Sequence, residues 1–127
     1  MEQRELMGQV IGDLAMLVDV PFSIDSVEPD VVEAGLRNFV GRALINSVSD
    51  KAGTKEQIFA LAKIYGAAVL ILPLGDKGLP ATAEERVAIA KKLITEGKAA
   101  GLKDSDFMLD PLVLTAASDG QAPVETL

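Results

Sequence analysis

Three polar side chains stand at the ends of predicted strands, and their types suit the recognition of a small ring. They are Asp25, Asn46 and Asp110, and each directly follows a short apolar run. In parallel α/β proteins the carboxyl ends of the strands face one rim, where ligands bind. Two carboxylates and one carboxamide offer several acceptors and one amide donor pair. This set matches a flat heterocycle with N–H and amino groups along its edge, whereas phosphate is bound by cations or backbone N–H groups.

Each of these residues also has a purely structural interpretation, which the sequence leaves open. Asp25 could cap the following helix together with Ser26, and Asn46 could be an ordinary turn residue. Asp110 precedes Pro111, a pair that often opens a loop. The three residues therefore carry a functional hypothesis only as a set.

The element that organises the rest of the chain is residues 67–78, AAVLILPLGDKG. Its first eight residues are apolar, which is far fewer than the roughly 20 that a membrane span needs. They predict a strand buried on both faces, as in parallel sheets. The glycine-rich GDKG at 75–78 predicts a connecting turn, because a lone G-x-x-G is a weak ligand signal.

The other predicted elements alternate between helix and strand. Helices are expected at about 2–18, 29–38, 54–65 and 83–100, and strands at 20–24, 43–45, 67–74 and 107–109. Thr-x-x-Gln at 54–57 and Thr-x-x-Glu at 82–85 predict capping boxes, and Gly66 and Gly101 predict helix ends. The apolar helix faces are expected to carry Leu6, Val10, Leu14, Leu17 and Val18; Val32, Leu36 and Phe39; Ile58, Leu61, Ala62 and Tyr65; Val87, Ala90, Leu93 and Ile94. This alternation predicts an α/β fold of right-handed βα units with a parallel sheet.

Composition excludes several classes of function. The chain has 127 residues, 49% of them hydrophobic, with 12 basic and 19 acidic residues and a formal charge of -7. It has no basic stripe, which argues against nucleic acid and anionic membrane surfaces. The absence of cysteine and histidine excludes thiolate metal sites, disulfides and histidine acid–base chemistry. No nucleophile stands out, and Glu84, Glu85 and Arg86 are interpreted as a solvated helix start. The N-terminal MEQRELMGQV has no apolar signal core, so a cytoplasmic protein is expected.

The segments around the strand ends resemble a known enzyme family. They read PFSIDS (21–26), EAGL (33–36), RALINS (42–47), YGAAVLILPLGDKG (65–78) and MLDPLVL (108–114). Together they are similar to the pterin-binding methyltransferases that use methyltetrahydrofolate and a corrinoid. This group includes the methyltransferase that serves the corrinoid iron–sulfur protein and the folate domain of cobalamin-dependent methionine synthase. The resemblance covers about 21–114, and its specificity comes from the order of I-D-S, I-N-S and L-D-P-L.

The resemblance implies positioning roles for the three strand-end residues. Asp25 would hydrogen-bond the reduced pterin ring, and Asn46 would contact the amino and nitrogen edge of that ring. Asp110 would accept from the ring N–H and the exocyclic amino group. The reaction implied is methyl transfer from N5 of methyltetrahydrofolate to cobalt of a corrinoid on a partner protein, with no covalent enzyme intermediate.

The chain is shorter than the barrel that this family uses. A (βα)8 barrel takes roughly 250 residues. The four predicted strands correspond by resemblance to strands 3 to 6 of a dihydropteroate synthase-like TIM barrel, so residues 1–127 are expected to form about half of one. Because the outer strands would be open edges, we expect a homo-oligomer or the remainder of a longer chain. Two alternatives stay open: a non-catalytic, self-associating half-barrel, and a dihydropteroate synthase-like protein. The second is disfavoured because the I-N-S and L-D-P-L motifs resemble the methyltransferases more.

Overall fold

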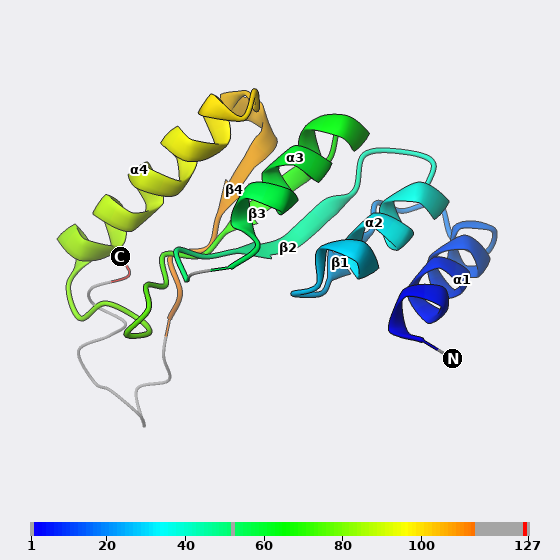
Figure 1. The fold of residues 1–127 in the computed structure, drawn as a ribbon, viewed down its shortest axis with the longest axis horizontal. Helices are drawn as coiled ribbons and strands as arrows, with labels where there is room; N and C mark the ends of the chain where they lie inside the picture. The colour runs from blue at the N-terminus through cyan, green and yellow to red at the C-terminus, as the bar shows by residue number, and fades with distance from the viewer. Residues whose placement is uncertain (1, 52, 114–125, 127) are drawn as a thin grey trace.

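The computed structural model describes residues 2–51, 53–113 and 126, and within them four parallel strands form one sheet. The strands lie in the order β1-β2-β3-β4, so that chain order is also spatial order. Figure 1 shows the helices following the same order across the molecule, from α1 at one end to α4 at the other. The element bounds are α1 Gln3–Ala15, β1 Ser23–Asp25, α2 Pro29–Asn38, β2 Leu44–Val48, α3 Lys55–Tyr65, β3 Ala68–Ile71, α4 Ala83–Ala99, the 3-10 helix η1 Asp104–Asp106 and β4 Phe107–Leu109. The predicted α/β fold with a parallel sheet is confirmed.

The sheet is covered on one face only within the described residues. Along β3 the burial alternates, with Val69 and Ile71 fully buried and Ala68 and Leu70 partly exposed. Successive side chains of a strand point to opposite faces, so the buried residues face the helices and the others face an open side. The prediction that this strand is buried on both faces is therefore wrong, because no described element covers the second face.

The core lies between the covered face and helices α2, α3 and α4. Gly35 of α2 lets that helix approach β1, because a Cβ there would lie 3.1 Å from Ile24 carbons. Gly97 of α4 lies even closer to β4, because a Cβ there would lie 2.7 Å from the ring of Phe107. Phe59 of α3 is buried beside the same glycine. Close helix–sheet packing at these points holds the strands at fixed positions beneath the helices.

The apolar face predicted for the first helix is left largely uncovered. Helix α1 packs against α2, and Ile11 is its buried residue. Leu6, Val10, Leu14, Leu17 and Val18 are between 42% and 77% exposed. Val87 of α4, predicted on an apolar face, is likewise half exposed. The other predicted positions of α2, α3 and α4 are buried or pack against the core: Val32, Leu36, Phe39, Ile58, Leu61, Ala62, Tyr65, Ala90, Leu93 and Ile94.

The predicted helix caps are confirmed in part. The Thr82 hydroxyl accepts a hydrogen bond from the Glu85 N–H, as a cap residue should. Thr54 precedes α3 but makes no side-chain cap; its hydroxyl instead donates to the Val27 carbonyl. Gly66 directly follows α3 and Gly101 lies two residues after the end of α4; both have positive φ, which confirms the predicted helix ends.

The predicted strand positions are right, but the bounds of three strands are displaced, and β3 (Ala68–Ile71) is shorter than the predicted 67–74. Strand β1 begins later than predicted and includes Asp25, and β2 extends through Asn46 to Val48. Asp25 and Asn46, which were expected just after their strands, therefore lie within them, because strand pairing continues past the apolar residues. The turn at 75–78 is closed by two hydrogen bonds between Gly75 and Gly78, and the predicted tail from 116 lies largely outside the described residues. No helix in the described part of the chain is long and apolar enough to cross a membrane.

Candidate functional site

Two of the three predicted site residues are direct neighbours in the sheet. Asp25 of β1 is in register with Asn46 of β2, one strand across. Ile24 and Ile45, the residues before them, are buried at 1% and 0% exposure against the helices. Because side chains alternate along a strand, Asp25 and Asn46 belong to the open face. The sequence prediction that these side chains share one rim is consistent with this register.

The same row continues across the sheet with apolar residues. Asn46 is level with Leu70 of β3, and Leu70 is level with Met108 of β4. Both are at least partly exposed, and Met108 is about half exposed. The carboxyl end of the open face therefore has polar groups on β1 and β2 and an apolar surface on β3 and β4.

Asp110 lies beyond this row, at the end of β4. Its N–H donates to the Ile71 carbonyl at 3.1 Å, which keeps it paired with β3 one residue past the strand. Leu109 is level with Ile71, which faces the helices. Because side chains alternate along a strand, the next residue, Asp110, belongs to the open face as well. Two strand spacings of about 4.8 Å separate β2 from β4. Asp110 is therefore on the same face as Asn46 but about 10 Å across the sheet from it, with Leu70 between them.

The three side chains differ in how they are used within the fold. In the described part of the chain, neither the Asp25 carboxylate nor the Asn46 carboxamide makes a hydrogen bond or ion pair. The Asp110 Oδ1 accepts from the Leu112 N–H at 2.9 Å, which closes a local turn. Each carboxylate oxygen can accept more than one hydrogen bond, so Asp110 keeps acceptor capacity for a ligand. The structural interpretation of Asp110 as a loop opener and its functional interpretation are thus compatible.

The serines that follow Asp25 and Asn46 line a separate cavity. This cavity, of about 210 Å³, lies where β1 and β2 meet the start of α3, and its lining includes Ser26, Ser47 and Lys55. The I-D-S and I-N-S segments therefore divide their polar residues, with Asp25 and Asn46 on the open face and the serines toward α3. The sequence analysis missed Lys55 here because charge at a helix start is common and gives no distinctive signal.

Asp25 itself lines a different cavity. This cavity, of about 350 Å³, lies between α1 and the end of β1, with Leu6 and Val10 in its lining. Neither Asn46 nor Asp110 lines it. Asp25 therefore stands at the free edge of the sheet, with open space toward α1.

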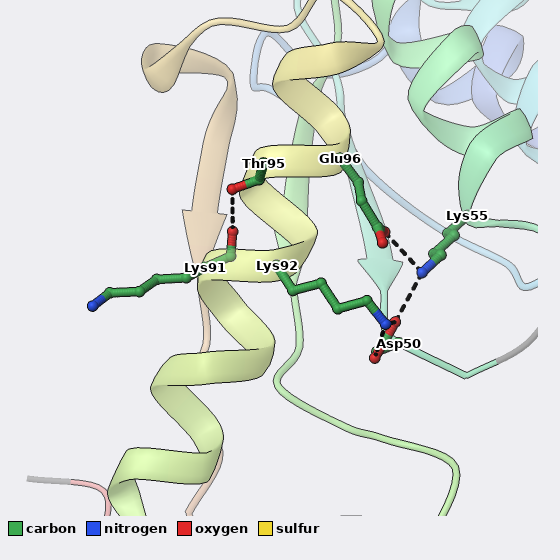
Figure 2. Close-up of polar contacts among 6 residues, drawn as sticks. All are labelled: Asp50, Lys55, Lys91, Lys92, Thr95 and Glu96. Atoms are coloured by element: carbon green, nitrogen blue, oxygen red, sulfur yellow. Dashed lines mark hydrogen bonds and ion pairs between the residues drawn. The ribbon is translucent and has the colours of Figure 1, made fainter.

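A group of charged residues beside the rim forms ion pairs, in contrast to the open-face residues. Asp50 follows β2 and contacts both Lys55 of α3 and Lys92 of α4 through N–O distances of 2.7–2.8 Å. Lys55 also pairs with Glu96 at 2.7 Å (Figure 2). Hydrogen bonds from Lys55 and Lys92 hold the pKa of Asp50 below its ordinary value, and the bonds to Asp50 and Glu96 raise the pKa of Lys55. We call these four residues the Asp50 cluster; it joins the loop after β2 to α3 and α4.

Arg86 is not a solvated residue, contrary to the sequence interpretation of the start of α4. It is 4% exposed and is the buried charged residue of the described core. Its guanidinium donates to the carbonyls of Pro80 and Leu112, at 3.2 and 2.9 Å. The sequence could not reveal this, because arginine in a first helical turn is usually exposed and its partners lie in distant loops.

Comparison with known proteins adds an independent line of evidence. A family model described as "Pterin binding enzyme" matches residues 2–125. The methionine synthase of Mycobacterium tuberculosis (strain ATCC 25618 / H37Rv) is 34% identical over 118 residues, which cover 88% of this chain and 10% of that protein. The methionine synthase of Mycobacterium leprae (strain TN) is 32% identical over 118 residues, with the same coverage. The chain thus spans about a tenth of the length of these relatives.

Proposed function

Because this chain belongs to the family of pterin binding enzymes, we propose that it is the pterin-binding part of a methyltransferase. The proposed substrate is methyltetrahydrofolate, and the proposed reaction moves its N5 methyl group to the cobalt of a corrinoid. The observation that carries the proposal is the pair formed by Asp25 and Asn46. The two residues are in register on an open sheet face, and neither side chain has a partner among the described residues.

The chemistry of the three side chains fits the edge of a reduced pterin. The ring carries N–H and amino donors, which carboxylates accept, and ring nitrogens, which a carboxamide can both donate to and accept from. We assign Asp25 and Asn46 to one part of the ring and Asp110 to the N–H and exocyclic amino groups. Leu70 and Met108, between these polar groups, provide an apolar surface against which the face of the ring can lie.

The residues of this chain would act by binding and orienting the methyl donor. A bicyclic ring held at both edges presents N5 in one direction, so part of the entropy loss of orienting the methyl donor occurs on binding, before methyl transfer. Hydrogen bonds that stabilise the departing tetrahydrofolate nitrogen would lower the barrier further. The corrinoid, held by a partner protein or a partner domain, supplies the methyl-accepting metal. The two compared relatives carry the name methionine synthase, which supports this partner assignment.

The open edges of the sheet support a second part of the proposal. Strands β1 and β4 have no further strand beside them among the described residues, and the apolar face of α1 is uncovered. Free edges of this kind tend to pair with another chain. We propose that either a second copy or further segments of a longer protein complete the sheet. The same observation favours the alternative of a non-catalytic module that works by self-association.

Titration with methyltetrahydrofolate tests the pterin assignment. We expect saturable binding by the chain, weakened about tenfold or more in Asp110→Ala, since a hydrogen bond to a charged group contributes about 1.5–3 kcal/mol. In Asn46→Ala the loss should be about fivefold, since a hydrogen bond to a neutral group contributes about 1 kcal/mol. The matched control is Asp13→Ala, which removes an exposed carboxylate of α1 and should leave the affinity unchanged. Equal and negligible binding by all four proteins would remove the assignment.

Size-exclusion chromatography with light scattering, combined with the methyltetrahydrofolate titration, separates the two candidate functions. A self-associating chain that binds methyltetrahydrofolate supports the methyltransferase part, and a self-associating chain that does not bind it supports the non-catalytic module. A stable monomer that binds no pterin contradicts both.

A further inference from the structure

The loop that carries Asp110 is tied to the interior by one buried guanidinium. Arg86 Nη1 donates to the Leu112 carbonyl at 2.9 Å and lies 3.4 Å from the Pro111 carbonyl oxygen. The same nitrogen donates to Thr126 Oγ1 at 2.8 Å, and that hydroxyl donates to the Leu112 carbonyl at 2.8 Å. Through its Nε, Arg86 also holds the Pro80 carbonyl of the loop after β3. One side chain of α4 therefore fixes the loops that follow two neighbouring strands.

Leu112 has an unusual backbone conformation at the centre of these contacts. Its φ is +61°, and it is the described non-glycine residue with positive φ. A leucine rarely adopts this left-handed conformation, which persists where surrounding contacts enforce it. Here the contacts are visible on both sides of the residue. The Asp110 carboxylate accepts from the Leu112 N–H, and the Arg86 guanidinium binds the Leu112 carbonyl.

We propose that Arg86 is a positioning residue that sets the orientation of the Asp110 carboxylate toward the pterin. Arg86 holds Leu112 in its left-handed conformation, and the Leu112 N–H in turn fixes Asp110 Oδ1. The remaining acceptor capacity of the carboxylate is thereby directed at the ligand before the ligand binds. Arg86 is too buried to reach the open face itself, so it acts through Leu112 and Asp110. This inference rests on the proposed pterin-binding function, because it concerns the same site.

A ligand-free measurement tests the positioning chain directly. Amide hydrogen exchange of Leu112, followed by nuclear magnetic resonance, reports whether its N–H is held by Asp110. We expect the exchange to be slow in the wild type and about tenfold faster in Asp110→Ala, Arg86→Met and Arg86→Lys. Arg86→Lys keeps the positive charge but replaces the planar guanidinium with a compact ammonium, which cannot reproduce the separate contacts of Nε with Pro80 and of Nη1 with Leu112. It is the variant of choice if Arg86→Met does not fold. Unchanged Leu112 exchange in a folded Arg86 variant would overturn the proposal.

A double-mutant cycle measures whether Arg86 acts through Asp110. We expect Arg86→Lys to weaken methyltetrahydrofolate binding by about tenfold in the wild-type background and to have no further effect in Asp110→Ala. In an Asn46→Ala background the full tenfold effect should remain, because Asn46 lies on β2, outside the Arg86 contacts. A merely structural role of Arg86 would weaken binding equally in all backgrounds, and that result would overturn the proposal.

The two measurements also separate this inference from the proposed function. If the wild-type chain binds no methyltetrahydrofolate, the proposed function fails and the role toward pterin fails with it, whatever the Leu112 exchange shows. If the wild type binds but Arg86→Lys changes neither binding nor exchange, the proposed function stands and the positioning role is wrong.

Discussion

Strand β2 (Leu44–Val48) and the loop after it carry two polar residues, Asn46 and Asp50, whose environments in the fold are opposite. Asn46, inside the strand, faces the open side and has no partner among the described residues. Asp50, two residues past the strand, is 15% exposed and contacts two lysines. The comparison teaches that a polar residue at a strand end is available to a ligand only where the neighbouring helices leave it unpaired. The open face is therefore suited to ligand binding, whereas the Asp50 cluster stabilises the fold. The experiments below test this difference.

The largest expected effect comes from removing both open-face neighbours. Asp25→Ala combined with Asn46→Ala should weaken methyltetrahydrofolate binding by about 100-fold or more, because two sets of hydrogen bonds to the ring are lost. The free energy of unfolding should change by less than about 0.5 kcal/mol, since neither side chain has a partner within the described fold. Isothermal titration and urea unfolding measure the two quantities. A large loss of stability would show that this pair is structural.

The next effect concerns the centre of the Asp50 cluster. Lys55→Met should lower the free energy of unfolding by about 2 kcal/mol, because Asp50 and Glu96 lose their shared cation in a mostly buried position. Pterin affinity in the folded protein should stay within about twofold of the wild type. Lys63→Met, on the same helix and outside the cluster, is the control. Loss of binding in Lys55→Met at unchanged stability would reverse the assignment of the two regions.

A smaller effect is expected from acid. Lys55 and Lys92 lower the pKa of Asp50 in the folded protein, so the folded state binds the proton less readily than the unfolded state. The stabilisation is therefore present above the unfolded pKa of about 3.9 and is lost as pH falls through the lower, folded value. Urea unfolding between pH 6 and pH 3 should show a loss of about 1 kcal/mol that is absent in Asp50→Asn. An identical pH profile for both proteins would contradict this reading.

The raised pKa of Lys55 makes the stability of the fold depend on pH in the opposite sense, at alkaline pH. A lysine whose folded pKa is raised stabilises the fold fully below its unfolded pKa of about 10.4, and this contribution is lost as pH rises through the folded value. The Asp50 cluster should therefore be intact across the neutral range.

The smallest effect separates two adjacent lysines of α4. Lys92 contacts Asp50 but is 54% exposed, so solvent screens the pair, and Lys92→Met should cost about 0.5 kcal/mol. Lys91 points away from the cluster in Figure 2, and Lys91→Met should be neutral. Thermal unfolding of the two variants side by side measures the difference. Equal effects would mean that the Lys92–Asp50 contact contributes nothing.

Much of the fold follows from local patterns in the chain. Pro29 and Asn38 bound α2 as predicted, and Phe107–Leu109 is the predicted last strand. These predictions succeed because proline placement, helical spacing and short apolar runs act within a few residues. The Thr54 capping box fails because the tertiary structure turns its hydroxyl toward Val27. The prediction that the apolar face of α1 is buried fails for another reason. The residues do fall on one face, but no described element covers that face.

The order of the residues is enough to predict which side-chain types stand at the strand ends and the helix–strand alternation that makes the strands parallel. It thereby named Asp25, Asn46 and Asp110 as a set, a site hypothesis that binding measurements have yet to test. The folded chain was needed to establish that Asp25 and Asn46 are level, that Asp50 is paired, and that Arg86 is buried beneath the Asp110 loop. Side-chain type and periodicity are local properties, whereas register, burial and the pairing of charges depend on segments that meet only after the chain has folded.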